Sequence, residues 1–181
     1  MTLHVVPLAL PEVLHVTPTV HHDARGRFVE AFNHRDFQAA TGVDAVFVQD
    51  NQSRSARGVL RGLHLQEPNA QSKLVRVLAG AVFDVAVDVR RTSPRFGAWV
   101  GCRLDAESGA QLWIPAGFAH GYLVLSDVAE VLYKTTAYYA PECERVLRWD
   151  DPTVGVGWPL TAPPLMSARD AAGAALDAIA V

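Results

Sequence analysis

The sequence predicts a mainly β protein, a sandwich or barrel with a few short helices at its periphery. Most of the 181 residues fall in short segments where polar and apolar residues alternate, which is the pattern of half-buried strands. Turn-forming residues separate these segments at intervals of about 10–15 residues, as in antiparallel sandwiches and barrels. No repeat, low-complexity linker or change of composition divides the chain. We therefore expect a single domain over residues 1–181.

The expected elements can be placed in chain order. A helix is expected over residues 35–40, because Asn33 can cap its start and Gly42 can end it. Strands are expected over residues 46–51, 59–65, 73–78, 80–88 and 128–134. In the segment 80–88, the alternation places Asp84 and Asp88 on the same face of the strand.

The C-terminal segment carries the second helical signal. An alanine-rich stretch follows Ser167, which can cap a helix there. We expect the last ~20 residues to fray, as chain ends often do.

Composition narrows the functional classes. The formal net charge of −3 comes without any basic block, which argues against nucleic-acid binding. The apolar runs are shorter than the ~18–20 residues that cross a bilayer, and residues 1–15 lack a signal-peptide pattern. Cys102 and Cys143 have no metal-binding or disulfide-framework spacing. We expect a cytoplasmic protein that does not associate with membranes.

His64 is the first candidate for chemistry. It lies between two leucines, where burial would favour its neutral, basic form. A lone histidine in this setting is more often a core residue, but Arg61 and Lys73 are close along the chain. Arg61 and His64 are three residues apart and would lie on opposite faces of a regular strand. Both can face one pocket only if the strand twists or bulges near Gly62.

Three further side chains each admit two interpretations. Lys73 opens an alternating apolar segment, so it is either an inward-facing cation or a surface lysine whose ammonium group reaches water. Tyr133 lies in an expected strand and is either a proton donor or a half-buried aromatic residue. Tyr139 precedes Pro141 in an expected loop, where it can stack on a base or pack on the rim of the barrel.

Two segments match the paired motifs of the cupin barrel. These are residues 58–64, which end in His64, and residues 115–120, which end in His120. Metal-binding cupins carry a second histidine two residues after the first, where this chain has Gln66. A lysine near the ligands would oppose a divalent cation. We therefore expect no metal site.

Motifs spread over nearly the whole chain carry a more specific resemblance. They lie at residues 23–28 with Glu30, 47–51, 58–64, 73–76, 84–88, 93–97, 114–121, 133–134 and 149–152. Together they resemble the dTDP-4-dehydrorhamnose 3,5-epimerase family. The resemblance implies a homodimeric jelly roll that uses no metal or organic cofactor. It also implies inversion of C3 and C5 of dTDP-4-dehydro-6-deoxy-D-glucose in dTDP-L-rhamnose biosynthesis, which supplies lipopolysaccharide or O-antigen precursors.

The resemblance implies four catalytic residues. His64 would be the base, and Asp170 would bind its other ring nitrogen. Lys73 would face the oxygen of the enolate. Tyr133 would return a proton on the opposite face of the sugar ring, which inversion requires.

The resemblance also implies a set of substrate-binding residues. They are Arg25, Phe28, Glu30, Gln49, Asn51, Arg61, Lys73, His120, Tyr139, Glu144 and Arg169. Arg25 and Arg61 match contacts to the diphosphate and sugar, and Tyr139 matches the residue that stacks on thymine. The segment with Arg25 is expected to reach into the partner subunit's site. We further expect His120 to bind Asp84.

Alternatives remain open at this point. One is a relative that epimerises a single carbon, or isomerises the ketosugar, for a modified deoxysugar. Another is a cupin that binds a sugar nucleotide or other small molecule without catalysis, which the fold alone would permit. The last is a metal-dependent cupin dioxygenase or isomerase.

Overall fold

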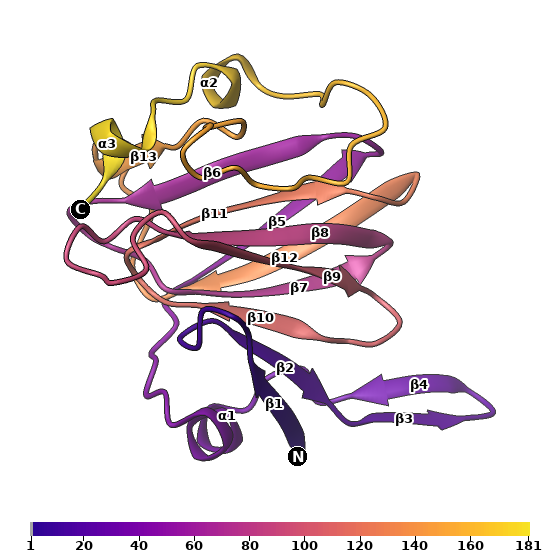
Figure 1. Ribbon diagram of the computed structural model, residues 1–181. Coiled ribbons are helices and arrows are strands. Elements are labelled where there is room, and N and C mark those ends of the chain that lie inside the picture. The colour runs from indigo at the N-terminus through magenta and orange to yellow at the C-terminus, as the bar shows by residue number, and fades with distance from the viewer. Residues whose placement is uncertain (1) are drawn as a thin grey trace.

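The computed structural model describes residues 2–181 and consists mainly of two antiparallel sheets that pack face to face (Figure 1). The six-stranded sheet has the order β1 (Leu3–Pro7), β2 (Leu14–Pro18), β10 (Gln111–Ile114), β7 (Lys73–Ala79), β12 (Val128–Thr135) and β5 (Gln49–Ala56). The five-stranded sheet has the order β13 (Glu144–Val146), β6 (Leu60–Gln66), β11 (Phe118–Val124), β8 (Ala81–Asp88) and β9 (Trp99–Asp105). β3 (Val20–Asp23) and β4 (Gly26–Val29) form a separate hairpin.

The main core lies between the two large sheets. Val75 and Val77 of β7 pack in one cluster with Val82 and Ala86 of β8, and all four side chains are buried. Alternating inward residues of both sheets therefore close the sandwich, as the pattern of the sequence predicts. The prediction of a mainly β, cupin-like jelly roll is confirmed. No helix in the described part of the chain has the length and apolar character needed to span a bilayer.

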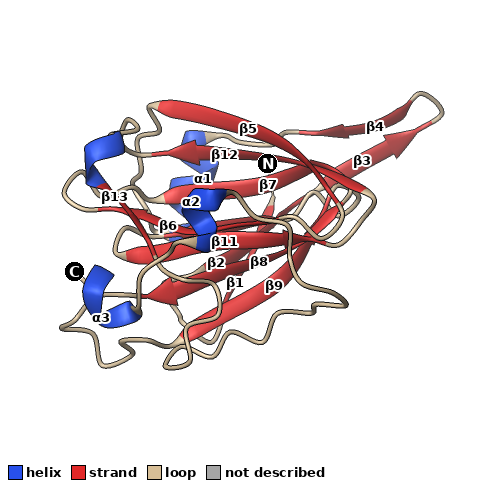
Figure 2. Cartoon of the chain, turned by 90° about the horizontal axis from the view of Figure 1, so that it is seen from above, coloured by secondary structure: helices blue, strands red, loops and turns tan. Residues whose placement is uncertain are grey.

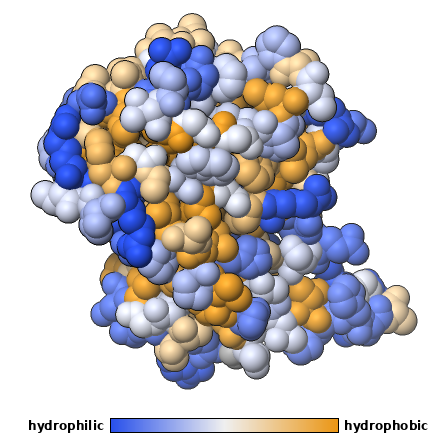
Figure 3. All heavy atoms as spheres, in the orientation of Figure 1, coloured by the Kyte–Doolittle hydropathy of each residue, from blue (hydrophilic) through white to orange (hydrophobic). Residues whose placement is uncertain are grey.

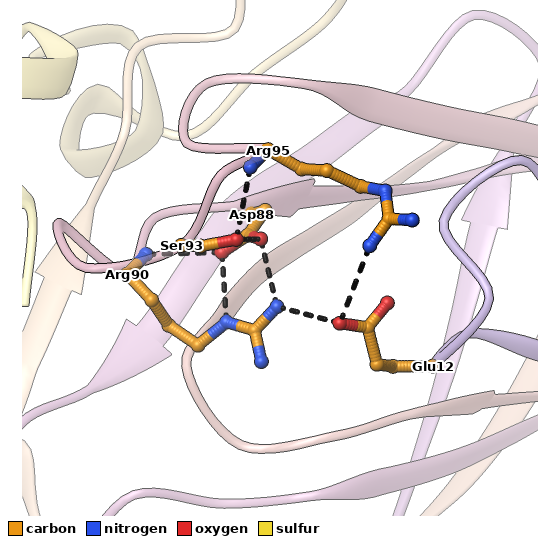
Figure 4. Close-up of polar contacts among 5 residues, drawn as sticks. All are labelled: Glu12, Asp88, Arg90, Ser93 and Arg95. Carbon is orange, nitrogen blue, oxygen red and sulfur yellow. Dashed lines mark hydrogen bonds and ion pairs between the residues drawn. The ribbon is translucent and has the colours of Figure 1, made fainter.

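The strand β8 confirms the expected alternation, and one of its carboxylates lies in a polar network (Figure 4). Asp88 accepts hydrogen bonds from Arg90 Nε at 2.9 Å, Arg90 Nη2 at 2.7 Å and Ser93 Oγ at 2.5 Å. Burial works to raise the pKa of Asp88, but the bonds from Arg90 and Ser93 lower it overall. Arg90 and Arg95 also contact Glu12. The network ties the turn before β2 to the loop after β8.

The helix α1 (His34–Thr41) is confirmed, with Asn33 and Gly42 as its caps. The side chain of Asn33 accepts a backbone N–H of the first turn, and Gly42 adopts the left-handed conformation at φ 73°. Phe37 is the buried residue of this helix. It packs against Trp113 of β10 with ring centroids 5.7 Å apart, so α1 covers the outer face of the six-stranded sheet.

The strand expected over residues 46–51 is placed wrongly. β5 begins at Gln49 and continues to Ala56, so only its first residues fall within the predicted range. Its sequence, QDNQSRSA, contains a single apolar residue. All eight residues of β5 pair with β12, so this pairing, rather than the local β propensity of the sequence, determines the strand.

The C-terminal tail is firmly packed, so the expectation of fraying is wrong. Ser167 caps α2 (Ala168–Ala171) as predicted, but the helix stops and a second one, α3 (Leu176–Ile179), follows. Leu176 and Ile179 are buried in a hydrophobic cluster beneath the tail. Backbone hydrogen bonds also join Val181 to the segment after β8. The short 3₁₀ helix η1 (Pro141–Cys143) precedes β13.

Candidate active site

A bulge in β6 turns two candidate residues toward one cleft. Arg61 and His64 pair with residues of β11 that are only two positions apart, so β6 contains one extra residue. Gly62 lies in this bulge at φ 115°, and a Cβ there would sit 2.6 Å from Gly121 Cα. Only glycine fits so close to β11. The irregularity that the spacing of Arg61 and His64 requires is therefore present, and both residues line the cleft.

The cleft has a volume of about 370 Å³ and lies between β6 and the C-terminal segment. Asp170 reaches it from α2, where Ser167 accepts the backbone N–H of Asp170 at 3.1 Å. Asp170 Oδ1 lies 2.8 Å from His64 Nε2, and Oδ2 accepts the Gly62 N–H at 3.2 Å. The expected pairing of Asp170 with His64 is thus present in the structure.

This pairing fixes which nitrogen of His64 can act as a base. Burial works to raise the pKa of Asp170, but the hydrogen bond and charge of His64 lower it overall, so Asp170 is ionised at neutral pH. An ionised carboxylate only accepts hydrogen bonds, so Nε2 must carry a proton. Nδ1 is then the nitrogen with a free lone pair in the neutral ring. The ring is about one-third exposed, so a substrate can reach it.

A narrow inner pocket of about 70 Å³ continues from the cleft and shares His64 and Glu144 with it. His64 comes from the five-stranded sheet, and Tyr133 comes from β12 of the facing sheet. A proton acceptor and a proton donor therefore line one pocket from opposite walls. The inner pocket is lined by Gln49, Asn51, His64, Leu65, Gln66, Gln71, Lys73, Tyr133, Tyr139 and Glu144.

Lys73 faces inward, so the interpretation as a surface lysine is wrong. Its side chain is buried, and Nζ donates to the backbone carbonyl of His64 at 3.1 Å. Burial lowers its pKa to about 8, while the charges of Asp84 and Glu144 oppose that shift. Lys73 is therefore mostly a cation at neutral pH. In residues 2–181, no three His, Cys, Asp or Glu side chains are grouped to hold a metal ion.

Tyr133 and His120 lie beside each other inside the barrel, with ring centroids 6.5 Å apart. Burial raises the pKa of the half-buried Tyr133, so its hydroxyl keeps a proton to donate. His120 is buried, and its Nε2 lies 3.0 and 3.1 Å from the two carboxylate oxygens of Asp84. Burial lowers the pKa of His120 despite that carboxylate. The expected contact between His120 and Asp84 is present.

The rim of the inner pocket is a hydrogen-bonded group. The hydroxyl of Tyr139 donates to Glu144 at 2.8 Å, and Arg169 contacts both residues. Gln49 accepts the backbone N–H of Tyr139 at 3.0 Å and donates to Asn51 at 2.8 Å. Five of the predicted binding residues therefore meet at this rim.

Sequence reasoning missed two serines of β5. Ser55 accepts a hydrogen bond from Arg61 Nε at 3.0 Å, and Ser53 lies 2.6 Å from the hydroxyl of Tyr122. Both serines lie on the strand face that also carries Asn51. With the correct bounds for this strand, the alternation of side chains between its two faces places both serines on the same face as Asn51. Ser55 fixes the side chain of Arg61 at the edge of the cleft.

Three predicted binding residues do not join this site within the chain. Arg25, Phe28 and Glu30 belong to the hairpin β3–β4 or directly follow it, and the hairpin projects from the body (Figures 1 and 2). The Arg25 side chain is 90% exposed and pairs with Asp23, and Phe28 is 70% exposed. In the space-filling view the hairpin stands out at the lower right (Figure 3).

Comparisons with known proteins identify the family of this chain. Residues 7–178 match the model of a family described as dTDP-4-dehydrorhamnose 3,5-epimerase. A Pseudomonas aeruginosa protein of that name is 58% identical over 168 residues, which cover 93% of each chain. The crystal structure of a 3,5-epimerase from Legionella pneumophila, solved with dTDP-4-keto-L-rhamnose, matches with a TM-score of 0.96 and 46% identity. That match covers 98% of this chain and 95% of the other.

A relative with a narrower activity shares the same fold. ChmJ, a 3'-monoepimerase from Streptomyces bikiniensis solved with dTDP-quinovose, matches with a TM-score of 0.90 and 36% identity. That match covers 96% of this chain and 91% of ChmJ. The fold thus hosts epimerases of more than one outcome. The family match over residues 7–178 nevertheless settles the membership, and this chain belongs to the dTDP-4-dehydrorhamnose 3,5-epimerase family.

Proposed function

We propose that the protein inverts C3 and C5 of dTDP-4-dehydro-6-deoxy-D-glucose and so forms dTDP-4-dehydro-L-rhamnose for dTDP-L-rhamnose biosynthesis. The observation that carries this proposal is the inner pocket, where His64, Lys73 and Tyr133 meet from two facing sheets. A base, a cation and an acid are the groups that epimerisation beside a ketone needs. The cytoplasmic location stays a prediction from composition, and the use of the product in lipopolysaccharide or O-antigen stays a prediction from the resemblance.

The first half of the reaction makes an enolate. C3 and C5 both flank the C4 ketone, so their protons become acidic when the negative charge on the ketone oxygen is stabilised. In our proposal His64 Nδ1 takes the proton, and Asp170 stabilises the imidazolium that forms. The Lys73 ammonium faces the developing oxyanion in the narrow inner pocket.

The second half returns a proton to the other face of the ring. Tyr133 lines the wall opposite His64, and its raised pKa keeps the hydroxyl protonated until the enolate forms. The O–H bond breaks, the new C–H bond forms on the inverted face, and the ketone is restored. The phenolate then regains a proton from solvent, and His64 releases the proton it took. The same pair of groups serves C3 and C5 in turn.

The nucleotide is proposed to lie in the outer cleft and along the rim. Arg61, held by Ser55, offers a planar guanidinium to the diphosphate or the sugar. Tyr139 is 47% exposed, so its ring has a face available for stacking on thymine. Arg169 and Glu144 lie beside it.

We further propose that the site is completed in a homodimer. The hairpin β3–β4 forms a two-stranded sheet of its own, and such an isolated hairpin is marginally stable in water. Its Arg25 and Phe28 side chains are largely exposed, although the resemblance assigns both to the substrate. Docking of the hairpin against a second copy would bury Phe28 and bring Arg25 to the partner's cleft.

Subunit complementation tests this arrangement. Arg25→Ala removes a residue that would act in the partner's site, and His64→Asn removes one that acts in its own. Each variant should be nearly inactive alone. When the two are unfolded, mixed in equal amounts and refolded, half of the dimers are mixed and each contains one intact site. About a quarter of the wild-type activity should return. If none returns although mixed dimers are detected, Arg25 does not act across the interface.

Tyr133→Phe separates proton return from proton removal. Without the hydroxyl, the expected result is a loss of dTDP-L-rhamnose formation of about 10²-fold in a coupled assay with a rhamnose-forming reductase. Deuterium exchange at C3 in D2O should fall much less, because His64 and Lys73 remain. Tyr122→Phe is the matched control, since Tyr122 is another tyrosine of the barrel interior, but its hydroxyl bonds Ser53. Equal losses of exchange and product formation would show that Tyr133 has a structural role.

The proposed function itself is tested by product analysis. The purified protein is incubated with dTDP-4-dehydro-6-deoxy-D-glucose, the rhamnose-forming reductase and NADPH, and the sugars are identified by NMR. Formation of dTDP-L-rhamnose is the expected result. A product inverted at C3 alone would assign the protein to the same class of reaction as the monoepimerase. An unchanged substrate would contradict the proposal.

A further inference from the structure

Lys73 poses a problem of charge balance. Of the lysines and arginines in residues 2–181, Lys73 alone is buried. No carboxylate in the described residues forms an ion pair with it, and its hydrogen-bond partner is the backbone carbonyl of His64. An ammonium group without a counter-charge is costly to bury and tends to lose its proton. Some nearby negative charge must therefore keep Lys73 protonated.

Two other carboxylates near the pocket are held by other groups. Glu144 forms an ion pair with Arg169 and accepts the hydroxyl of Tyr139. Asp170 is bound by His64 and by the Gly62 N–H. The Glu144 charge raises the pKa of Lys73 less than the Asp84 charge does, and Asp170 lies beside His64 in the outer cleft.

Asp84 is different, because its carboxylate is fully buried and its hydrogen bonds within residues 2–181 come from His120 alone. Burial lowers the pKa of His120, so this imidazole is neutral at neutral pH. It can donate its Nε2–H to Asp84, but it adds no positive charge. Asp84 therefore brings one unbalanced negative charge to the interior of the barrel, and Lys73 brings one unbalanced positive charge.

The topology brings these charges together. Asp84 is on β8 of the five-stranded sheet, Lys73 is on β7 of the facing sheet, and His120 is on β11 beside β8. Asp84 has the same inward orientation as Val82 and Ala86, which pack against β7 residues in the core. Lys73 Nζ bonds the carbonyl of His64, which pairs in the sheet with His120, the residue bound to Asp84. Asp84 and Lys73 are thus buried, oppositely charged side chains on facing sheets.

We propose that Asp84 is the counter-charge that keeps Lys73 protonated, with neutral His120 holding the Asp84 carboxylate in place. Asp84 touches no substrate in this account and acts through Lys73 as a positioning residue. The consequence for catalysis rests on the proposed function, because it assumes that the Lys73 ammonium stabilises an enolate. The charge pairing itself does not depend on that assumption.

The direction of the expected pH effect follows from the groups around Lys73. His64 of β6, His120 of β11, Tyr133 of β12, Asp84 of β8 and Glu144 of β13 surround it. Of these, the charges of Asp84 and Glu144 raise the pKa of Lys73 against the effect of burial. Removing the Asp84 charge must lower that pKa further, so the lysine would lose its proton at a lower pH.

The chain is well suited to a direct measurement, because Lys73 and Lys134 are its two lysines. Protein labelled with ¹³C at lysine Cε should give two signals, and Lys134→Arg assigns them. Lys134 pairs with Asp50 at 3.0 and 3.1 Å on the outer part of the sheet and serves as an internal reference. In the wild type, Lys73 should titrate near pH 8.

Asp84→Asn should lower the Lys73 midpoint by about one unit or more and leave the Lys134 midpoint unchanged. Asp88→Asn is the matched control: it removes another buried carboxylate from β8, but one whose charge Arg90 balances. It should weaken the fold and leave the Lys73 midpoint in place. An unchanged Lys73 midpoint in folded Asp84→Asn would overturn the proposal.

Activity provides the second readout. The alkaline limb of the kcat profile should fall as the pH rises through the Lys73 midpoint, and in Asp84→Asn it should shift with the NMR midpoint. If the NMR midpoint of Lys73 shifts but the alkaline limb of kcat does not, the charge pairing is supported. The same result would show that the Lys73 ammonium does not stabilise the enolate. A lower kcat with neither midpoint nor limb moved would show that Asp84 has a structural role only.

A double variant covers the case in which Asp84→Asn does not fold. Lys73→Met and Asp84→Asn each leave one buried charge without its partner, whereas the double variant removes both charges. It should therefore unfold at a higher temperature than either single variant. Effects on the unfolding temperature that simply add would contradict a charge pair between Asp84 and Lys73.

Discussion

Replacing His64 with asparagine is expected to lower kcat by about 10⁴-fold, which is the upper range for the loss of a positioned general base. Asparagine keeps a side-chain amide that can donate to Asp170, so α2 should stay in place. It has no nitrogen that can take a proton. Deuterium exchange and product formation should therefore both disappear. Binding of dTDP, measured by titration calorimetry, should stay within several-fold of the wild type, because His64 is not assigned to the nucleotide.

The control for this variant is His15→Asn. His15 lies on β2, outside the residues that line the cleft or the inner pocket, so the substitution should leave kcat unchanged. Substantial turnover by folded His64→Asn would show that another group removes the proton. A parallel loss of dTDP binding and turnover would instead show that the substitution damages the pocket.

Replacing Lys73 with methionine should lower kcat by about 10² to 10³-fold, the usual effect of losing one group that stabilises an oxyanion. Methionine fills a similar volume without a charge. The enolate forms before deuterium is incorporated and before the product forms. Deuterium exchange at C3 should therefore fall as much as turnover. The outcome expected for Tyr133→Phe is different, because there deuterium exchange should fall much less than product formation.

Lys134→Met is the matched control for that experiment. It removes the other lysine of the chain, which pairs with Asp50 away from the inner pocket, and should leave kcat within about two-fold. If Lys73→Met keeps wild-type exchange at C3, the enolate is stabilised by another group, and His120 becomes the next candidate.

Local sequence patterns predict those parts of the fold in which the local preference of the residues matches the environment that the tertiary structure gives them. The alternation in residues 80–88 correctly places Asp84 and Asp88 on one face of β8, and both side chains are buried. The spacing of Arg61 and His64 correctly requires an irregular strand, and the bulge at Gly62 supplies it. In both cases one physical constraint, burial or a shared pocket, decides the conformation.

The errors arise where tertiary contacts override local preference. β5 is polar on both faces because its inner face lines the site, so its extent could not be read from hydrophobic alternation. The tail favours helix by composition, but Gly173 lies so close to Arg148 that a Cβ would meet its backbone at 2.8 Å. Packing of Leu176 and Ile179 then fixes the tail.

The family resemblance, more than local patterns, points to the residues of the candidate site. Patterns in the chain alone leave Lys73 and Tyr133 with two interpretations each. Both side chains reach the pocket of His64 because β7 and β12 are neighbours in the sheet that faces β6. Ser55 and the charge of Asp84 could not be recognised from sequence, because their importance depends on what lies across the barrel. The place of Arg25 depends on a second subunit and stays a proposal.

The most direct test of the account is deuterium incorporation from D2O into the sugar, followed by NMR with the reductase trapping the product. The wild-type protein should place deuterium at both C3 and C5 and yield dTDP-L-rhamnose, and His64→Asn should place deuterium at neither carbon. Deuterium at both carbons with the His64→Asn variant would contradict the central claim that one base, His64, removes both protons.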